Sequence, residues 1–294
     1  PGSWAKTKTP AGTASKMPSA MPRPFVTPPN SVEEHAATVV MLPGFTNTGK
    51  NFGKGWLPML RQRLGVTKLG RLKFVWLNAP VITISCYKDH PRVPAWHDYF
   101  TDHGGDEGHP EIEEEINVDD LAWSRSQVHA ILDTEAAALG GDYGRVVVGG
   151  ASQGACVALD VALTHPRGGE LAGVYLSFGQ LYSVTPVPTN LPQLRVVAFH
   201  GADDWVISPS LAMKSYSRLI DAGMRRFKLV LEPGLGHSQS SDAEGIVFVD
   251  ALNDWSLFEI APLGAQGRPP ASAPVSPSSK GSAKVNTESQ GPRV

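Results

Sequence analysis

The stretch VVVGGASQG, residues 146–154, decides the fold that this sequence predicts. A β-branched run leads into Ser152, which stands between glycines at the spacing G-x-S-x-G. That spacing is typical of a nucleophile elbow, a sharp strand-to-helix turn that lifts a serine hydroxyl clear of a sheet. The alternative is a glycine-rich strand end with a solvent-exposed serine. The flanking segments favour the elbow, because residues 145–148 predict a buried strand and residues 155–165 predict a helix.

The chain of 294 residues is long enough for one α/β domain with a large core. Residues 1–31 and 263–294 are rich in Pro, Ser and Ala and contain few aliphatic residues. Such segments bury too little apolar surface to offset the entropy of ordering them. The sequence therefore predicts a folded domain over residues 32–262 between two disordered tails.

Charge and cysteine content exclude several classes of protein. A formal net charge of −2 argues against a nucleic-acid-binding protein, which normally has a basic face. Cys86 and Cys156 are too few for a disulfide framework. The sequence contains no run of 18 apolar residues, so it predicts no transmembrane helix. We therefore expect a cytoplasmic protein, with at most transient contact with a membrane surface. Residues 1–32 contain cations but no acidic residue, which is also typical of an organelle transit segment.

Between the tails, short apolar runs alternate with longer helical patterns. Continuous apolar strands suit a parallel sheet that is covered on both faces, and helical crossovers suit a doubly wound topology. The sequence thus predicts an α/β fold with a mostly parallel sheet. The expected strands are residues 37–42, 72–77, 145–148, 171–176, 194–199 and 227–231, and the expected helices are residues 118–139, 154–165, 209–222 and 244–258.

One long irregular segment, residues 78–117, interrupts this alternation. Its prolines and glycines predict a loop, and loops of this length are usually functional or disordered. Because it carries Trp96, Tyr99 and Phe100, we expect a structured lid whose aromatic side chains, Trp96 first among them, bind the substrate.

Chemistry in an open parallel sheet takes place beyond the carboxyl ends of its strands, where candidate partners for Ser152 occur. His237 follows the last expected strand in a glycine-flanked loop and would act as the general base. Asp204 follows the preceding strand and would orient the imidazole, with Asp203 as the competing choice. We assign His200 a structural hydrogen bond in the acid loop. The chain order Ser, Asp, His is that of α/β-hydrolases.

The tetrahedral intermediate of acyl transfer needs hydrogen-bond donors aimed at its oxyanion. We expect the backbone N–H of Gln153, directly after the nucleophile, to be one donor. The second is the N–H of Phe45 in the loop after the first long strand, since Pro43 has no N–H.

The sequence predicts no metal site and no cofactor. A cluster of His103, Asp106, His109 and Glu113 fits no metal-binding spacing, and its glycine-rich surroundings favour a solvated loop. The chain also lacks a phosphate-binding glycine loop.

Several motifs resemble the acyl-protein thioesterases, in the phospholipase/carboxylesterase family of α/β-hydrolases. The segment GGASQGA at 149–155 resembles that family's elbow GGFSQGG, and residues 44–49 resemble its oxyanion loop GxGDTG. Further matching motifs follow in the family's order: Asn78-Ala79-Pro80, Trp96-His97-Asp98, His200-Gly201-x-x-Asp204 and Gly236-His237-Ser238. On this resemblance Asp204, not Asp203, is the acid.

The chain also departs from the family pattern near the expected site. Pro43 replaces a histidine, and Thr46-Asn47 replaces Gly-Asp in the oxyanion loop. Trp205 stands where a proline follows the acid, and Ser208 replaces a later proline.

The main hypothesis is a serine hydrolase that cleaves thioester or ester bonds through an acyl-enzyme on Ser152. The resemblance implies S-acylated proteins as substrates, with long acyl chains on cysteine. One alternative is a carboxylesterase or lysophospholipase acting on small esters or lysolipids. Another is a binding protein that keeps the fold without activity, for which the altered oxyanion loop is the main support.

Overall fold

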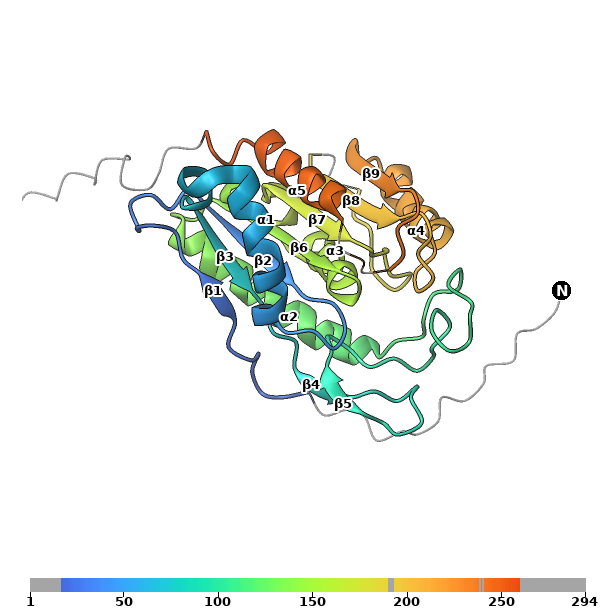
Figure 1. The fold of residues 1–294 in the computed structure, drawn as a ribbon. Helices are drawn as coiled ribbons and strands as arrows, with labels where there is room; N and C mark the ends of the chain where they lie inside the picture. The colour runs from blue at the N-terminus through green and yellow to red at the C-terminus, as the bar shows by residue number, and fades with distance from the viewer. Residues whose placement is uncertain (1–16, 190–192, 238, 240, 260–294) are drawn as a thin grey trace, which may run out of the picture.

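Residues 17–189, 193–237, 239 and 241–259 are described by the computed structural model, in which helices cover both faces of a central sheet (Figure 1). The sheet has the strand order β1-β3-β2-β6-β7-β8-β9, and β4 and β5 form a separate hairpin. All pairings in the sheet are parallel except that of β1 with β3. Its strands are β1 Phe25–Thr27, β2 Ala37–Leu42, β3 Leu72–Trp76, β6 Val146–Ala151, β7 Gly173–Ser177, β8 Arg195–Gly201 and β9 Arg226–Glu232, and the hairpin is β4 Val81–Thr83 and β5 Arg92–Pro94.

The helices divide between the two faces of the sheet and build two separate cores (Figure 1). On one face α1 (Gly49–Leu69) and α5 (Asp242–Asp254) bury Trp56 and Phe248, whose rings meet edge to face at 5.0 Å between centroids. On the other face lie α2 (Val118–Ala138), α3 (Gln153–Thr164) and α4 (Pro209–Asp221). Because both faces are covered, every residue of β2 is buried, as expected for a parallel sheet.

The structure confirms the predicted α/β-hydrolase fold, including the six strands and four helices expected from the sequence. The ends of these elements differ from the predicted ones by at most four residues, and β2 has the predicted ends, which is within the usual uncertainty of boundaries predicted from sequence. It also adds two short 3-10 helices, Tyr143–Arg145 and Gly168–Glu170.

The predicted N-terminal tail was too long. The sequence placed residues 1–31 in a disordered segment, but residues 25–27 form β1 and pair antiparallel with β3. A strand of three residues between prolines is too short to show an alternating hydrophobic pattern, so the sequence did not reveal it. In the structure, its Phe25 side chain packs on the core beneath α1 and α5. Residues 1–16, 260–262 and the predicted C-terminal tail, 263–294, lie outside the described residues.

Helix α1 was not predicted at all, because several glycines and Pro58 interrupt its sequence. In the structure these residues have specific places. Gly65 adopts a φ of 70° at a kink in the helix, a conformation that favours glycine. Gly53 packs so closely on the Trp76 ring that a Cβ would lie 2.9 Å from it. The glycines that hid the helix from the sequence pattern therefore let it approach the sheet.

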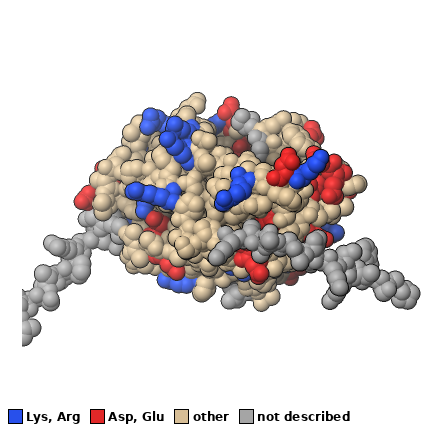
Figure 2. Space-filling view, turned by 90° about the horizontal axis from the view of Figure 1, so that it is seen from below, with Lys and Arg blue, Asp and Glu red and all other residues tan. Residues whose placement is uncertain are grey.

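The structure shows how the cationic side chains are distributed on one face and how apolar the described helices are. On the face seen in Figure 2, Lys and Arg do not gather into one continuous patch. Among the described residues, no helix is both long and apolar enough to cross a bilayer.

A buried ion pair joins α2 to α3, and its loss should destabilise the fold. Asp160 is fully buried and accepts hydrogen bonds from Arg125 Nε at 2.7 Å, Arg125 Nη2 at 2.8 Å and Thr185 Oγ1 at 2.6 Å. We expect Asp160→Ala to lower the free energy of unfolding by about 3–5 kcal/mol, because the partly buried guanidinium loses its counter-charge. Urea unfolding measures this loss.

The matched control for Asp160→Ala is Glu170→Ala. Glu170 pairs with Arg167 on the surface, where both side chains are about half exposed. Exposed pairs contribute little, so the unfolding midpoint of this variant should hardly change. Equal midpoints for the two variants would contradict the role given to Asp160.

Candidate active site

Ser152 lies between β6 and α3 in a backbone conformation that residues other than glycine rarely adopt. Its φ is 52° and its ψ is −125°, which costs roughly 1–3 kcal/mol and persists only where the surroundings enforce it. Part of that enforcement is a hydrogen bond from the Ser152 N–H to the Ser177 carbonyl, 2.8 Å long, at the end of β7. The predicted elbow is therefore present.

The two glycines of the G-x-S-x-G motif are required by close backbone contacts. A Cβ on Gly150 would lie 2.5 Å from the carbonyl carbon and oxygen of Gly154. A Cβ on Gly154 would lie 2.3 Å from the Leu42 carbonyl oxygen and 2.4 Å from that of Pro43. The start of α3 thus packs directly against the loop that follows β2.

The structure brings Ser152, His237 and Asp204 together, although 85 residues of sequence separate the serine from the histidine. His237 Nε2 lies 2.9 Å from Ser152 Oγ, and His237 Nδ1 lies 2.8 Å from Asp204 Oδ2. Because a carboxylate only accepts hydrogen bonds, Nδ1 carries the proton and Nε2 is free to accept the serine proton. This is the geometry that general-base activation of a serine requires.

Asp204 is held as a carboxylate by its surroundings. Burial by itself would raise its pKa, but hydrogen bonds from His200 and His237, the positive charge that His237 carries when it is protonated, and the Ile207 N–H together hold the pKa well below its usual range. His200 Nε2 lies 2.8 Å from the Ile207 carbonyl oxygen and 3.2 Å from Asp204 Oδ2. His200 thus lies in the acid loop, where a structural role was predicted, and exposed Asp203 does not contact the imidazole.

The predicted oxyanion donors lie near the nucleophile. Neither the Phe45 N–H nor the Gln153 N–H has a hydrogen-bond partner among the described residues, whereas the Thr46 N–H donates to the Pro94 carbonyl at 2.8 Å. Thr46 adopts a φ of 65°, in the region that glycine occupies most easily. The loop thus forms although threonine stands in place of glycine at position 46. That the N–H groups of Phe45 and Gln153 act as an oxyanion hole is a proposal.

Trp96 does not line the cavity, contrary to the prediction that it binds substrate. Its side chain is fully buried, and its Nε1–H donates to the Pro43 carbonyl at 2.8 Å. Its backbone N–H donates to Gln153 Oε1 at 2.9 Å. Trp96 therefore links the oxyanion loop to the elbow. An aromatic residue in a long loop gave no indication of which way its ring would point.

Trp96→Phe tests this correction, because it removes only the indole N–H and part of the ring. We expect the free energy of unfolding to fall by about 1–3 kcal/mol, since the Pro43 carbonyl loses its buried partner. The preference among esters of increasing acyl length should stay unchanged, whereas Tyr99→Ala, which alters a cavity wall, should change it. A shift of that preference in Trp96→Phe would restore the role in substrate binding.

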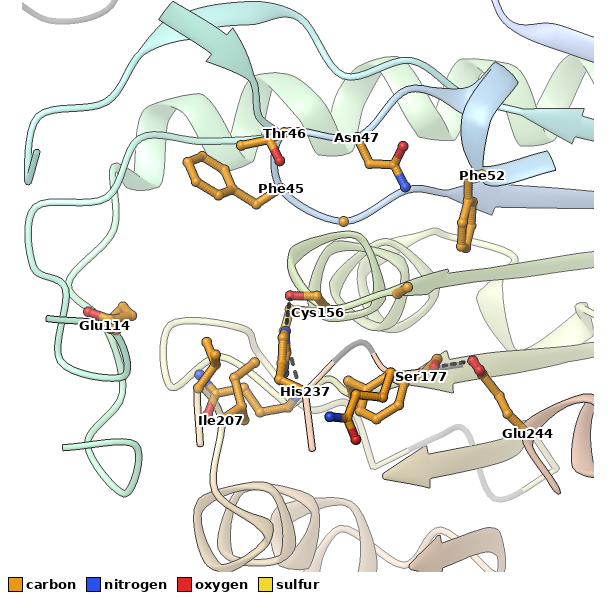
Figure 3. A pocket seen from close by; sticks show the side chains of 18 of the residues that line it. Phe45, Thr46, Asn47, Phe52, Glu114, Cys156, Ser177, Ile207, His237 and Glu244 are labelled. Atoms are coloured by element: carbon orange, nitrogen blue, oxygen red, sulfur yellow. Dashed lines mark hydrogen bonds between the residues drawn. The ribbon is translucent and has the colours of Figure 1, made fainter. Parts of the chain in front are cut away.

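The cavity around Ser152 has a volume of about 1060 Å³, at the upper end of the usual range for ligand sites. In the view of Figure 3, Phe45, Glu114 and Ile207 lie on one side of His237, and Phe52 and Glu244 lie on the other. Aromatic and aliphatic side chains form much of the wall, and no Lys or Arg is among the described residues that line it. Such a cavity suits a long apolar group better than an anionic one.

The segment 78–117 is structured and contributes to this cavity through Tyr87, Tyr99 and Glu114, among others. The Glu114 carboxylate accepts hydrogen bonds from the backbone N–H of His103 at 2.9 Å and of Gly104 at 2.8 Å. Phe100 is exposed and does not line the cavity.

The histidine and acidic cluster of the loop, which the sequence did not favour as a metal site, and the cysteine of the cavity have the following surroundings. His103 lies 2.6 Å from Glu107, and in the part of the chain that the structure describes no group of three His, Cys, Asp or Glu side chains is placed to hold a metal. Cys156 lines the cavity, but burial raises the pKa of its thiol to about 12. It is therefore neutral, and a neutral buried thiol is a poor nucleophile.

Several residues around Ser152 and His237 were not identified from the sequence. The Phe178 ring meets the His237 ring edge to face at 5.7 Å between centroids, and Ser177 bonds to Glu244. Phe52 and Trp56 belong to α1, the helix that was not predicted. The only sequence signal for Ser177 and Phe178 is their position at the end of a strand.

Comparison with known proteins agrees with this geometry. A model of the phospholipase/carboxylesterase family matches residues 23–247. Acyl-protein thioesterase 1 of Neurospora crassa is 28% identical over 231 residues, which cover 76% of this chain and 87% of that protein. Acyl-protein thioesterase 1 of Schizosaccharomyces pombe is 27% identical, with 71% and 87% covered.

Solved structures show the same fold. SOBER1 of Arabidopsis thaliana superposes with a TM-score of 0.62 at 20% identity, covering 75% of this chain and 99% of that one. Acyl-protein thioesterase 2 of Zea mays superposes with a TM-score of 0.59 at 20% identity, covering 79% and 98%. At these identities the likeness establishes the fold alone.

Proposed function

The chain belongs to the phospholipase/carboxylesterase family of ester hydrolases, and we propose that it removes long acyl chains from protein cysteines through an acyl-enzyme on Ser152. The observation that carries this proposal is the hydrogen-bonded series of Ser152, His237 and Asp204 at the wall of a large, mostly apolar cavity. Curated relatives named acyl-protein thioesterases support the choice of substrate.

In the proposed mechanism, His237 Nε2 takes the Ser152 proton as Oγ attacks the thioester carbonyl. The N–H groups of Phe45 and Gln153 stabilise the oxyanion of the tetrahedral intermediate, each contributing on the order of 3 kcal/mol. Protonated His237 then returns the proton to the leaving thiolate, and Asp204 stabilises the imidazolium throughout. Water attacks the acyl-enzyme in the second half by the same route and releases the fatty acid.

The absence of Lys and Arg from the described cavity wall bears on the competing substrates. Each CH₂ buried in an apolar wall contributes about 0.8 kcal/mol, which favours a long acyl chain. An anionic headgroup would lie near the acidic side chains of Asp102 and Glu114 with no Lys or Arg on the described wall to pair with, which disfavours anionic lysolipids. Small esters and neutral or zwitterionic lysolipids remain the alternatives to be tested. The cytoplasmic location and transient membrane contact also stay predictions.

The test is to treat the protein with a fluorophosphonate probe and, in parallel, with a palmitoyl thioester peptide, using Ser152→Ala as the control. Labelling together with thioester cleavage, both abolished in the variant, would support the proposal. Labelling without thioester cleavage would move the substrate to small esters or lysolipids. A wild-type protein that is not labelled would favour the binding-protein hypothesis.

A further inference from the structure

Glu244 is an acidic side chain in the cavity for which the proposed reaction has no use. It lies in the first turn of α5 and contacts the Ser177 hydroxyl (Figure 3). Glu244 forms no ion pair with any Lys, Arg or His among the described residues. Burying a carboxyl group without a cation beside it costs free energy, which only hydrogen bonds or protonation can reduce.

Ser177 connects Glu244 to the nucleophile. It is the last residue of β7 and lies opposite Ala151, the last residue of β6. Its hydroxyl donates to Glu244 Oε1, and its carbonyl oxygen accepts the Ser152 N–H at 2.8 Å. Ser177 therefore links Glu244 to the strained backbone of Ser152 through two hydrogen bonds, one made by its hydroxyl and one by its carbonyl oxygen.

The surroundings of Glu244 offer its charge little compensation. Burial raises the pKa of its carboxyl to about 7, and the hydrogen bond from Ser177 only partly opposes this rise. From α1 the cavity presents Trp56 and Met59, which are uncharged. Among the titratable groups nearby, Tyr175 of β7 donates its OH to the Glu244 carbonyl oxygen at 3.2 Å, and His237 lines the same cavity. Asp242 on α5 is 97% exposed and lies 3.6 Å from Arg63.

We propose that Glu244 is a positioning residue, which fixes the end of β7 through its hydrogen bond with Ser177 and so keeps Ser152 in its attacking position. This rests on the proposed role of Ser152 as nucleophile. Attack requires Oγ to be aligned with both the imidazole and the oxyanion donors, and a misplacement of about 1 Å costs on the order of 100-fold in rate. An ionised Glu244 would place a second negative charge in the cavity where the oxyanion forms, which opposes the reaction.

Two substitutions separate the hydrogen bond from the charge. Glu244→Ala removes both, and we expect kcat for a short p-nitrophenyl ester to fall about 10- to 100-fold with KM changed less than about twofold. Glu244→Gln keeps a neutral hydrogen-bonding group and should restore most of kcat. If KM changes while kcat stays constant, or if glutamine rescues nothing, the proposal is wrong.

The pH profile provides a readout that a purely structural role would not move. The ratio of wild-type kcat to Glu244→Gln kcat should be constant at low pH and fall as the pH rises through about 7, because only the wild type ionises there. Taking the ratio cancels the titration of the triad, which both proteins share. Asp250→Asn removes an exposed charge from the same helix and should leave a flat ratio. A flat ratio for Glu244→Gln would overturn the proposal.

The link through Ser177 is tested with a double-mutant cycle, measured as the rate of Ser152 labelling by a fluorophosphonate. Ser177→Ala should slow labelling, and adding Glu244→Ala should slow it little further, because both act on one series of bonds. Additive effects would show that Glu244 does not act through Ser177. Because labelling needs no natural substrate, a protein that is labelled in this way but fails to cleave the palmitoyl thioester would refute the proposed function alone.

Discussion

Ser152→Ala should lower kcat for ester hydrolysis by roughly a million-fold and leave the domain folded. The expected fall is this large because the proposed reaction passes through a covalent bond to Oγ. Cys156, the other potential nucleophile among the described residues of the cavity, is a neutral buried thiol. The remaining rate would come from binding and from the oxyanion donors alone.

Stability should change little in Ser152→Ala. Alanine has the same Cβ and keeps the backbone N–H that donates to Ser177, so the strained turn stays as it is. The substitution removes the hydrogen bond between Oγ and His237 Nε2, which is 2.9 Å long. Thermal unfolding of the two proteins is the control. A variant that is folded and still hydrolyses the ester at a hundredth of the wild-type rate or more would exclude Ser152 as the nucleophile.

Asp204→Asn should lower kcat on the order of 10⁴-fold without a comparable change in KM. In the wild type, Asp204 Oδ1 accepts the N–H groups of Val206 at 2.9 Å and Ile207 at 3.0 Å, and Oδ2 faces His237. An asparagine would keep its oxygen towards the two backbone donors, which turns its NH₂ group towards His237. His237 Nδ1 would then have to accept a hydrogen bond from this NH₂ group, so Nε2 would carry the imidazole proton. The imidazole could not take the serine proton in that state.

Asp203→Asn is the matched control for this prediction. Asp203 is the neighbouring carboxylate, it is exposed, and its backbone N–H donates a hydrogen bond of 3.0 Å to the Leu235 carbonyl. Its variant should keep wild-type kcat, as steady-state kinetics on the same ester would show. If Asp203→Asn were the inactive variant and Asp204→Asn the active one, the acid of the proposed triad would be wrongly assigned.

The pattern of the sequence was sufficient for the buried strands and most helices. A strand covered on both faces must be apolar throughout, so β2 and the start of β6 are visible as unbroken apolar runs. It was insufficient for β1 and α1. The three residues of β1 are too few to show a hydrophobic pattern. The glycines of α1 look like helix breaks in the sequence, and only the structure shows that Gly53 packs against the Trp76 ring.

Within the site, the elbow and the order of Ser152, Asp204 and His237 were identified from the sequence, because glycine spacing and strand ends are local features. The direction of a side chain in a long loop is not local. The Trp96 indole points to Pro43 instead of the cavity because the oxyanion loop packs beside it, 53 residues away in the chain. The same holds for Ser177 and Glu244, which meet across 67 residues.

The sequence by itself determined the fold, the family and the three residues proposed for catalysis, since each depends on local periods and on spacings that one backbone geometry imposes. Only the tertiary structure decided which residues line the cavity, that Trp96 hydrogen-bonds to Pro43 in the loop after β2, and that Glu244 contacts Ser177, whose carbonyl oxygen accepts the Ser152 N–H. The physical reason is that burial and hydrogen bonding depend on which elements pack together. Packing brings side chains from α1, β7 and α5 to one place although they are far apart in the chain.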